Sequence, residues 1–522
     1  MRMGALIVFC VACGGAKRGG DPDAGAPDAS TTGGGHVASA SLPQTIAGAA
    51  WVDPDAYATI PVHVIVDGDA ASVGVSIDTT ETAATKIGGE WIANVAVGSL
   101  ADGTHQLSAQ ARGGDGSTAT VGADLVAGRA GMQWTQIDVD KNAGTPRLLR
   151  DGATMLVTWT DISDGTRSLW LRPLDGAGRP TGARVRLAGG AAKPDVLYAR
   201  TALGAQTIGV LYQQPGGPYT NFFTIVDKSG ATKLDPIALD PQGRYGSFGG
   251  DLVFDGHAFV IVWRTNDGAG KSDVRWARID EASGAVTGPI VVAAAGNGDP
   301  HAGFDPFTFI GVRPAGEGAG SLVAFTRYEH DAALDTDIPK CQLATVSDSG
   351  TVTTSVIAEK GGGFLWDHEC RVLGSQPIAL WSASDLASSD PNPPVGFFAA
   401  SAASGALPAD RGNGHLVVTA ADNRTEPALV ETAAAQPTLA WLDERTYVDL
   451  QTGRIELYAA PLAADLSAGA PIVFEHARFI EGTSELGGAA AGTNAILTWI
   501  DERHGGNINN PRPEVYLETV WN

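Results

Sequence analysis

Two short stretches of the chain carry the same charged triplet. Asp443-Glu444-Arg445 lies in TLAWLDERT, and Asp501-Glu502-Arg503 lies in AILTWIDERH. Carboxylate and guanidinium groups gathered in this way can hold a polar ligand, and paired carboxylates can also catalyse glycoside cleavage. The structural alternative is that each Asp accepts N–H groups of a turn while each Arg pairs with a neighbouring carboxylate. Both triplets follow an apolar run ending in Trp, so a repeated element must position them.

That element is one of seven apolar strands beyond Gly128, each of which ends in an aromatic residue. A second alternating strand follows each of them, a third follows most, and a weaker segment precedes each. Four short strands per repeat are typical of one β-propeller blade. We therefore expect an all-β chain in which residues 128–522 form a seven-bladed β-propeller. The repeated aromatic residues, about 57 residues apart on average, are Trp159, Tyr212, Trp263, Phe325, Trp381, Trp441 and Trp499.

The ends of this region predict how the ring closes. The last repeat stops at Asn522 after its third strand, and a strand-like stretch at residues 132–142 precedes the first repeat. On the last blade, that stretch would supply the missing outer strand and cover an edge prone to aggregation. Six blades with a separate hairpin are the alternative, because the second repeat is the least regular.

The repeat resembles one that is common in secreted bacterial propellers, Trp-x-Asp-x-Arg followed by Leu or Ile-Tyr-Ala. The stretch from Trp441 with Leu457-Tyr458-Ala459 matches it well, and the stretch from Trp499 with Val515-Tyr516 matches nearly as well. The first repeat matches in part, and the other four are degenerate. The resemblance covers about 395 residues and implies an architecture, not an activity.

Residues 41–127 alternate between apolar and polar residues, with turn residues every ten or so positions. This pattern predicts a small β-sandwich. The stretch LADGTHQLSAQARGGDGSTATV at residues 100–121 resembles the last two strands of bacterial immunoglobulin-like modules. The resemblance implies an immunoglobulin-like domain that serves as a spacer or an adhesive unit.

The N-terminus predicts export. Residues 1–12 contain an apolar run that suits a signal peptide and is too short to span a bilayer. Ala12 before Cys13 resembles the lipobox of bacterial lipoproteins, which implies cleavage before Cys13 and lipidation of its thiol, although Cys10 stands where Leu is usual. An ordinary signal peptide is the alternative. Residues 13–40, rich in Asp, Pro, Ala and Gly, predict a disordered acidic linker.

The linker resembles those of myxobacterial lipoproteins, which implies an outer-membrane lipoprotein of the cell envelope, either periplasmic or surface-exposed. The formal net charge of −23 repels nucleic acid and anionic lipid headgroups. We therefore expect the lipid anchor to be the contact with the membrane, and we expect no nucleic-acid partner and a monomer.

The loops after the aromatic strands are longer in the last four repeats than in the first three. Longer loops over neighbouring blades would build one side of a rim, and loops are where binding residues concentrate. Neutral loop variation is the alternative. The candidate binding residues are Tyr328, His330, Asp335, Asp337, Asp443, Glu444, Arg445, Tyr447, Asp449, Asp501, Glu502, Arg503, His504 and Asn507.

Few residues suggest a metal, a cofactor or catalysis. Asp335 and Asp337, with Asp331 nearby, offer oxygen ligands for weak Ca²⁺ binding but lack the Gly-punctuated loop of a dedicated site. No zinc spacing, no Gly-x-Ser-x-Gly and no phosphate-binding Gly loop is present. The sequence therefore predicts no resident metal, no cofactor and no catalytic residue. Cys341 and Cys370 predict a disulfide between neighbouring blades, with two unpaired thiols as the alternative.

These patterns favour a lipid-anchored envelope protein without catalysis, whose propeller face binds a protein or a glycan. One alternative is a secreted or surface hydrolase or lyase that acts on glycans with acid residues of the same rim. Another is a purely structural component of the envelope.

Overall fold

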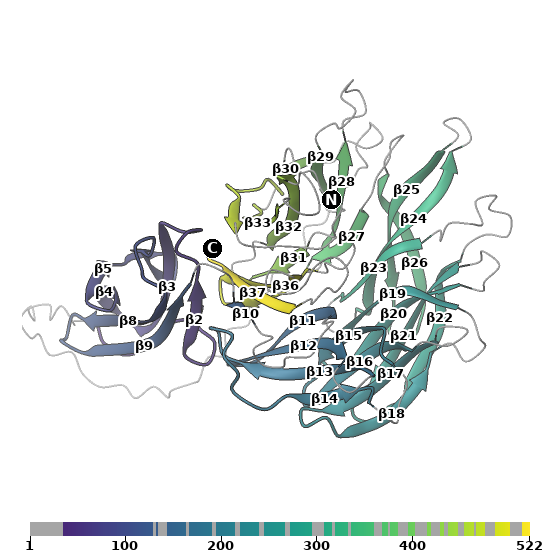
Figure 1. Ribbon diagram of the computed structural model, residues 1–522, viewed down its shortest axis with the longest axis horizontal. Coiled ribbons are helices and arrows are strands. Elements are labelled where there is room, and N and C mark those ends of the chain that lie inside the picture. The colour runs from purple at the N-terminus through teal and green to yellow at the C-terminus, as the bar shows by residue number, and fades with distance from the viewer. Residues whose placement is uncertain are drawn as a thin grey trace, which may run out of the picture.

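Every regular element in the described part of the chain is a β-strand, which confirms the all-β prediction (Figure 1). No helix among these residues is long and apolar enough to cross a membrane. The computed structural model describes residues 35–128, 132–133, 144–162, 166–190, 195–214, 220–239, 245–266, 272–294, 307–315, 319–331, 336–359, 368–373, 376–384, 395–401, 415–418, 428–432, 437–446, 454–463, 466–474, 486–501 and 514–522. The predicted signal peptide at residues 1–12, Cys13 and most of the predicted linker lie outside this set.

Residues 35–128 form two packed sheets, which we call the sandwich. The strand orders are β1-β3-β7-β6 and β2-β9-β8-β4-β5. Alternate side chains such as Val62, Val64 and Val75 are fully buried between the sheets. Strand β1 begins at Val37, within the stretch 13–40 that was predicted to be a disordered linker. The strands are β1 Val37–Ser41, β2 Ala49–Val52, β3 Thr59–Gly68, β4 Ala70–Ile77, β5 Thr80–Ala83, β6 Thr85–Ile87, β7 Glu90–Ala96, β8 Gly103–Gly113 and β9 Thr118–Ala127.

The described residues after the sandwich form seven four-stranded antiparallel sheets, which we call the ring. Six sheets each use four consecutive strands. The strands of the first three are β11 Gly144–Asp151, β12 Thr154–Ile162, β13 Arg167–Leu174, β14 Val185–Ala188; β15 Tyr198–Leu203, β16 Thr207–Gln214, β17 Thr220–Asp227, β18 Thr232–Ala238; and β19 Tyr245–Phe254, β20 Ala258–Asn266, β21 Ser272–Asp280, β22 Val286–Ala294. Those of the next three are β23 Phe307–Pro314, β24 Ser321–Asp331, β25 Thr336–Val346, β26 Val352–Glu359; β27 His368–Leu373, β28 Gln376–Ser384, β29 Val395–Ser401, β30 His415–Val418; and β31 Ala428–Glu431, β32 Pro437–Thr446, β33 Arg454–Pro461, β34 Ile472–Phe474.

The remaining sheet joins the two ends of the ring. Its order is β10-β37-β36-β35, where β10 is Met132–Gln133, β35 Gly487–Ala491, β36 Asn494–Asp501 and β37 Glu514–Val520. Met132 pairs with Leu517 and Gln133 with Tyr516. The stretch expected at residues 132–142 thus begins on the edge of the last sheet, and residues 134–142 lie outside the described part.

The first strands of the sheets, β11, β15, β19, β23, β27, β31 and β35, contact one another in chain order, and β35 contacts β11. The sheets therefore surround a common axis, as the blades of a β-propeller do. Figure 1 shows the sandwich beside this ring, with β2 facing it.

The sequence repeat corresponds to cross-strand aromatic pairs within the sheets. Trp441 pairs with Tyr458 and Trp499 with Tyr516, and their rings stack with centroids 5.5 and 6.0 Å apart. Such pairs stabilise neighbouring strands beyond the burial of their area. Among the repeated aromatic residues whose side chains are described, all are buried, as expected: Trp159, Tyr212, Trp263, Phe325, Trp441 and Trp499.

Candidate binding face

In every sheet the second strand ends and the third strand begins at one face of the ring, because every sheet has the same antiparallel order. We call this face the rim. Its described residues are 160–162, 166–168, 212–214, 220–221, 264–266, 272–273, 327–331, 336–340, 382–384, 395–396, 442–446, 454–456, 500–501 and 514. The described turns between first and second strands and between third and fourth strands lie on the opposite face.

The predicted loop at residues 327–340 is largely a hairpin, which corrects the sequence interpretation. Strand β24 continues through Asp331 and β25 starts at Thr336, so only residues 332–335 connect them. Tyr328, His330 and Asp337 therefore lie on strands, and His330 pairs directly with Asp337. This register brings an imidazole-bearing residue opposite a carboxylate-bearing one on the rim.

The charged triplets also begin on strands. Asp443, Glu444 and Arg445 belong to β32, and Asp501 is the last residue of β36. The register places Asp443 opposite Glu456, and it places Asp501 opposite Glu514. Seven of the sequence candidates lie outside the described residues: Asp335, Tyr447, Asp449, Glu502, Arg503, His504 and Asn507.

Glu456 and Glu514 are rim residues that the sequence analysis missed. The hydroxyl of Tyr458 donates to Glu456 Oε2 at 3.1 Å, and the hydroxyl of Tyr516 donates to Glu514 Oε2 at 3.0 Å. The signal was available, because a Glu stands two positions before the Tyr in both repeats and residues two apart on a strand share a face. Each of these carboxylates is thus hydrogen-bonded to the tyrosine of the aromatic pair in its own sheet.

In the first sheet the side chains of the Trp-x-Asp motif are described, so the role of its Asp can be seen there. The indole N–H of Trp159 donates to Asp161 Oδ2 at 3.0 Å, and Asp161 is 2% exposed. Arg184 lies 3.7 Å from the same carboxylate oxygen. In this sheet the Asp is therefore a buried structural acceptor and not a surface ligand group.

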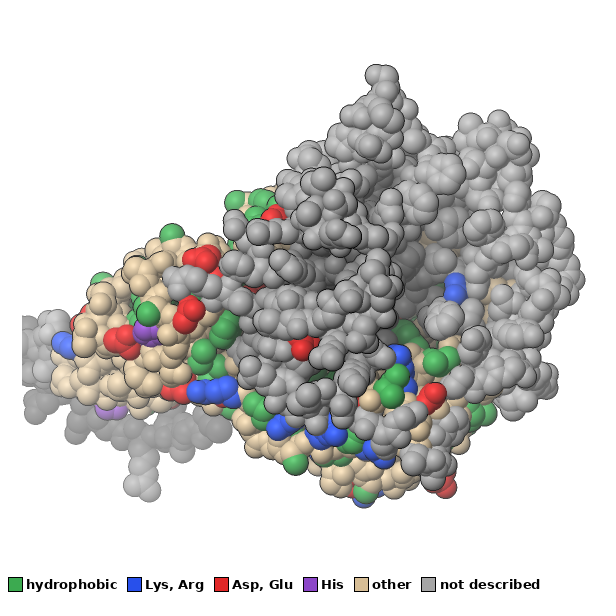
Figure 2. Space-filling view, in the orientation of Figure 1, with side chains coloured by type: hydrophobic (Ala, Val, Ile, Leu, Met, Phe, Trp, Pro, Cys, Tyr) green, Lys and Arg blue, Asp and Glu red, His purple; other side chains and the backbone are tan. Residues whose placement is uncertain are grey.

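Two arginines lie over the ring of Trp170 in the first sheet. The guanidinium carbons of Arg184 and Arg186 lie 4.0 and 4.7 Å from the ring centroid of Trp170, within the range of cation–π attraction. Residues 144–190 hold seven arginines against four aspartates, in a chain of net charge −23. Figure 2 shows Lys and Arg side chains over this part of the ring, close to the sandwich.

Cys341 is 9% exposed and disulfide-bonded. Cys370 lies on β27, which contacts the strand β25 that carries Cys341. The side chain of Cys370 is outside the described residues, so its identity as the partner stays a prediction. The described residues contain no group of three or more His, Cys, Asp or Glu side chains placed to hold a metal ion.

The sandwich contacts the face of the ring opposite the rim. The backbone N–H of Gly176, in the turn between β13 and β14, donates to the carbonyl of Ile46 at 2.8 Å. Gly492, in the turn between β35 and β36, approaches Pro43 so closely that an added Cβ would lie 2.5 Å from its carbonyl oxygen. Both turns belong to the opposite face, so the strand ends of the rim lie on the side of the ring away from the sandwich.

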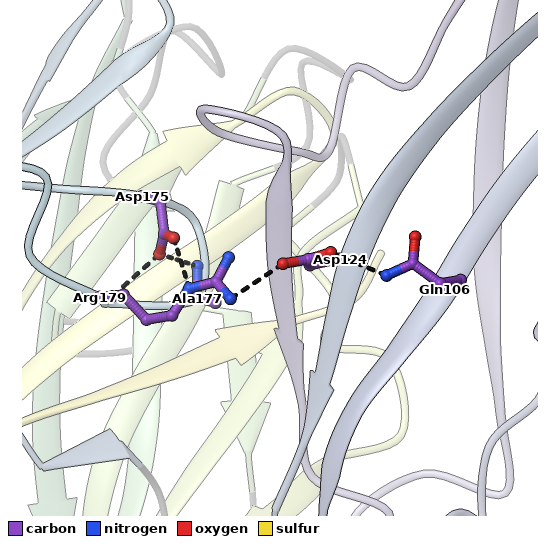
Figure 3. Close-up of polar contacts among 5 residues, drawn as sticks. All are labelled: Gln106, Asp124, Asp175, Ala177 and Arg179. Carbon is purple, nitrogen blue, oxygen red and sulfur yellow. Dashed lines mark hydrogen bonds and ion pairs between the residues drawn. The ribbon is translucent and has the colours of Figure 1, made fainter.

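A polar chain fixes this junction (Figure 3). Arg179 Nη1 donates to Asp124 Oδ2 of the sandwich at 2.9 Å, and Arg179 Nε donates to Asp175 Oδ2 at 2.6 Å. Asp124 also accepts from Gln106 Nε2 at 2.9 Å. Asp175 Oδ1 accepts the backbone N–H groups of Ala177 and Arg179, which holds the turn that presents the guanidinium group.

No protein-family model matches the chain, and no curated protein matches it. Among solved structures, the β-propeller domain of the Trilobed protease from Pyrococcus furiosus is similar at 7% identity and a TM-score of 0.39, covering 73% of this chain and 99% of that one. A neuraminidase-like protein of subtype N10 from A/little yellow-shouldered bat/Guatemala/060/2010 is similar at 6% identity and a TM-score of 0.36, covering 74% and 96%. A GH43 endo-arabinanase from Bacillus licheniformis is similar at 10% identity and a TM-score of 0.30, covering 53% and 99%. These similarities are too low to carry an argument about activity.

Proposed function

We propose that the chain is a lipid-anchored protein of the cell envelope whose seven-bladed propeller presents its rim to a protein or glycan partner, without catalysis. The immunoglobulin-like sandwich would hold the ring away from the membrane. The observation that carries this proposal is the arrangement of the two ends of the molecule. The N-terminal end of the described chain lies at one end, and the rim lies at the other.

The N-terminal end of the described chain lies at the tip of the sandwich that is remote from the ring. The backbone N–H of Val37 donates to Ser117 Oγ at 2.8 Å, and that of Asp69 donates to the carbonyl of His36 at 2.8 Å. Ser117 and Asp69 lie in the turns at the remote tip, whereas Pro43, Ile46 and Trp51 lie at the end that contacts the ring. An anchor that enters at the tip would leave the rim as the most distant surface.

The rim residues suit a polar partner. The hairpin β24–β25 carries Tyr328, His330 and Asp337, and the two charged triplets begin on β32 and at the end of β36 in the last two sheets. Aromatic and hydrogen-bonding side chains at loops on a rigid scaffold are typical of binding surfaces. The bonds of Glu456 and Glu514 to tyrosine hydroxyls favour a supporting role for these carboxylates over an acid–base role.

The anchor is tested by the intact mass and the detergent partitioning of the protein from its native envelope. We expect a mass that corresponds to cleavage before Cys13 plus acyl chains, and recovery in the detergent phase. A water-soluble protein that is cut elsewhere or uncut would contradict the lipoprotein assignment.

The rim is tested by the binding of the purified protein to isolated native envelope, separated into polysaccharide and protein fractions. The triple variant Tyr328→Ala, His330→Ala, Asp337→Ala is expected to bind about tenfold or more weakly, because hot-spot side chains carry most binding energy. Lys233→Ala, an exposed change on the outer strand β18, is the matched control. Equal loss in both variants, or no loss in the triple variant, would place binding elsewhere.

A glycan-active hydrolase is the second candidate, favoured by the cross-strand pairs Asp443–Glu456 and Asp501–Glu514. Residues directly opposite on antiparallel strands have Cβ atoms about 5 Å apart and share one face of the sheet. Retaining glycosidases use two carboxyl groups about 5–5.5 Å apart, so such a pair is a candidate for that arrangement. New reducing ends released from envelope polysaccharide by the purified protein, and lost in both Asp501→Asn and Glu514→Gln, would establish this candidate in place of the first.

A further inference from the structure

Among the described sheets of the ring, the last one combines strands from the beginning and the end of the ring segment, β10 and β35–β37. Its outer strand β10 pairs, among the described residues, with Tyr516 and Leu517 of β37. Strand β37 continues to Val520, and Trp521 and Asn522 follow it. Glu518, Thr519, Val520 and Trp521 are nearly fully buried, so their backbone polar groups require partners.

Tyr57 of the sandwich supplies two of these partners with one hydroxyl group. The hydroxyl donates to the carbonyl of Thr519 at 3.3 Å and accepts the backbone N–H of Trp521 at 3.1 Å. A neighbouring strand would offer the same two kinds of group, an N–H donor and a C=O acceptor, to an exposed strand edge. Burial raises the pKa of Tyr57 above its ordinary value, so the hydroxyl keeps the proton that it donates.

The ring of Tyr57 and the side chain of Trp521 extend this contact. Tyr57 packs edge-on against Phe474 of the preceding sheet, with centroids 6.4 Å apart. The indole N–H of Trp521 donates to the carbonyl of Trp51 at 2.9 Å, at the edge of the sandwich. One sandwich residue therefore contacts two neighbouring sheets of the ring, and the chain end contacts the sandwich in return.

Asn522, next to Trp521, forms hydrogen bonds that reach the preceding sheet. Its side-chain amide donates to Thr438 Oγ1 at 2.9 Å and to the carbonyl of Thr493 at 3.1 Å. Thr438 belongs to β32, and Thr493 lies in the turn before β36. The contacts of the sandwich and those of the chain end thus meet at the boundary between the last two sheets.

A continuous apolar core runs through the junction. Buried side chains of the sandwich, such as Val52 and Tyr57, belong to one cluster with Phe474, Trp499 and Trp521 of the ring. Ile46, 1% exposed, packs in a second cluster with Trp170 and Leu174 of the first sheet. The sandwich is therefore packed against the sheets on both sides of the point where the ring closes.

From these contacts we infer that the sandwich is part of the ring closure. The Tyr57 hydroxyl supplies the hydrogen-bond donor and acceptor that the outer strand of the last sheet would otherwise supply to β37 and the residues after it. Sandwich and ring consequently unfold as one cooperative unit, and the sandwich does not act as an independently moving spacer. The inference rests on the junction contacts alone and holds whether or not the rim binds a partner.

The test is hydrogen exchange and calorimetry of the full chain carrying Tyr57→Phe. This change removes the hydroxyl and keeps the ring that packs on Phe474. A buried donor or acceptor left unsatisfied costs about 1–3 kcal/mol, which corresponds to roughly 5- to 150-fold faster exchange of the Trp521 amide. Tyr198→Phe is the matched control, because it removes one hydroxyl bond, to the carbonyl of Gly250 at 3.0 Å, away from the junction.

The inference predicts a single calorimetric transition in the wild type and faster exchange at residues 514–522 in Tyr57→Phe. In Tyr198→Phe, exchange at residues 514–522 should rise by no more than the calorimetric loss of global stability accounts for. Two separate transitions in the wild type would overturn the inference. Exchange at residues 514–522 that is the same in both variants would overturn the role of Tyr57.

Discussion

At the residue scale, Arg179 connects two carboxylates from different parts of the chain. Its planar guanidinium group reaches Asp175 through Nε and Asp124 through Nη1, a geometry that a lysine ammonium cannot reproduce. A hydrogen bond from Gln106, and then one from Arg179, hold the pKa of Asp124 below its ordinary value. The junction is therefore sensitive to both the shape of the side chain and the pH.

We expect Arg179→Ala and Arg179→Lys to lower the free energy of unfolding by about 0.5–1 kcal/mol at pH 7, because the pair is partly exposed. The folded-state pKa of Asp124 is below its unfolded value of about 3.9. Its stabilising contribution is therefore fully present above that value and is lost as the pH falls through the folded pKa. Urea unfolding from pH 7 to pH 2.5 measures this, and a wild-type advantage that persists unchanged at the lowest pH would contradict it.

At the element scale, substitutions of the Asp in the Trp-x-Asp repeat can show whether each carboxylate stabilises its sheet or binds a partner. Asp161→Ala removes the acceptor of the Trp159 indole in a buried site and is expected to cost about 2 kcal/mol of unfolding free energy. Asp161→Asn keeps an oxygen acceptor and should cost less. Urea denaturation followed by tryptophan fluorescence measures both, and equal stability of Asp161→Ala and wild type would contradict the structural role.

The same substitution in the later repeats distinguishes two roles. If Asp443 and Asp501 are structural acceptors like Asp161, then Asp443→Ala and Asp501→Ala should destabilise the chain by a similar amount. If they contact a partner, stability should be retained while binding to envelope fractions falls. Paired measurements of stability and binding on the same samples decide between the two roles.

The strands of the ring were predictable because their aromatic and apolar residues recur with the period of the blades. The extent of β24 and β25 was not predictable, since the strand ends Tyr328–Asp331 and Thr336–Pro339 lack the apolar alternation that marks a half-buried strand. Polar residues that continue a hairpin beyond the core have the composition of a loop. The sequence therefore predicted the wrong local structure there, and the binding role of these residues stays a prediction.

At the scale of the whole molecule, the junction could not be predicted from sequence. Tyr57 and Thr519 are 462 residues apart in the chain, and nothing local distinguishes the hydroxyl of Tyr57 from that of any other core tyrosine. The alternation of residues 41–127 predicted a sandwich but not its place on the ring. That place depends on close backbone approach at Gly176 and Gly492, which appears only once both units are folded.

The central claim is that the rim is the partner-binding face, held away from the anchored end by a sandwich fixed to the opposite face. Peptide-resolved hydrogen exchange with and without isolated native envelope tests it most directly. We expect slower exchange at residues 327–340, 442–456 and 500–514 when envelope is added, and unchanged exchange at residues 43–57 and 175–179. Protection confined to the sandwich, or to the face that the sandwich covers, would contradict the account.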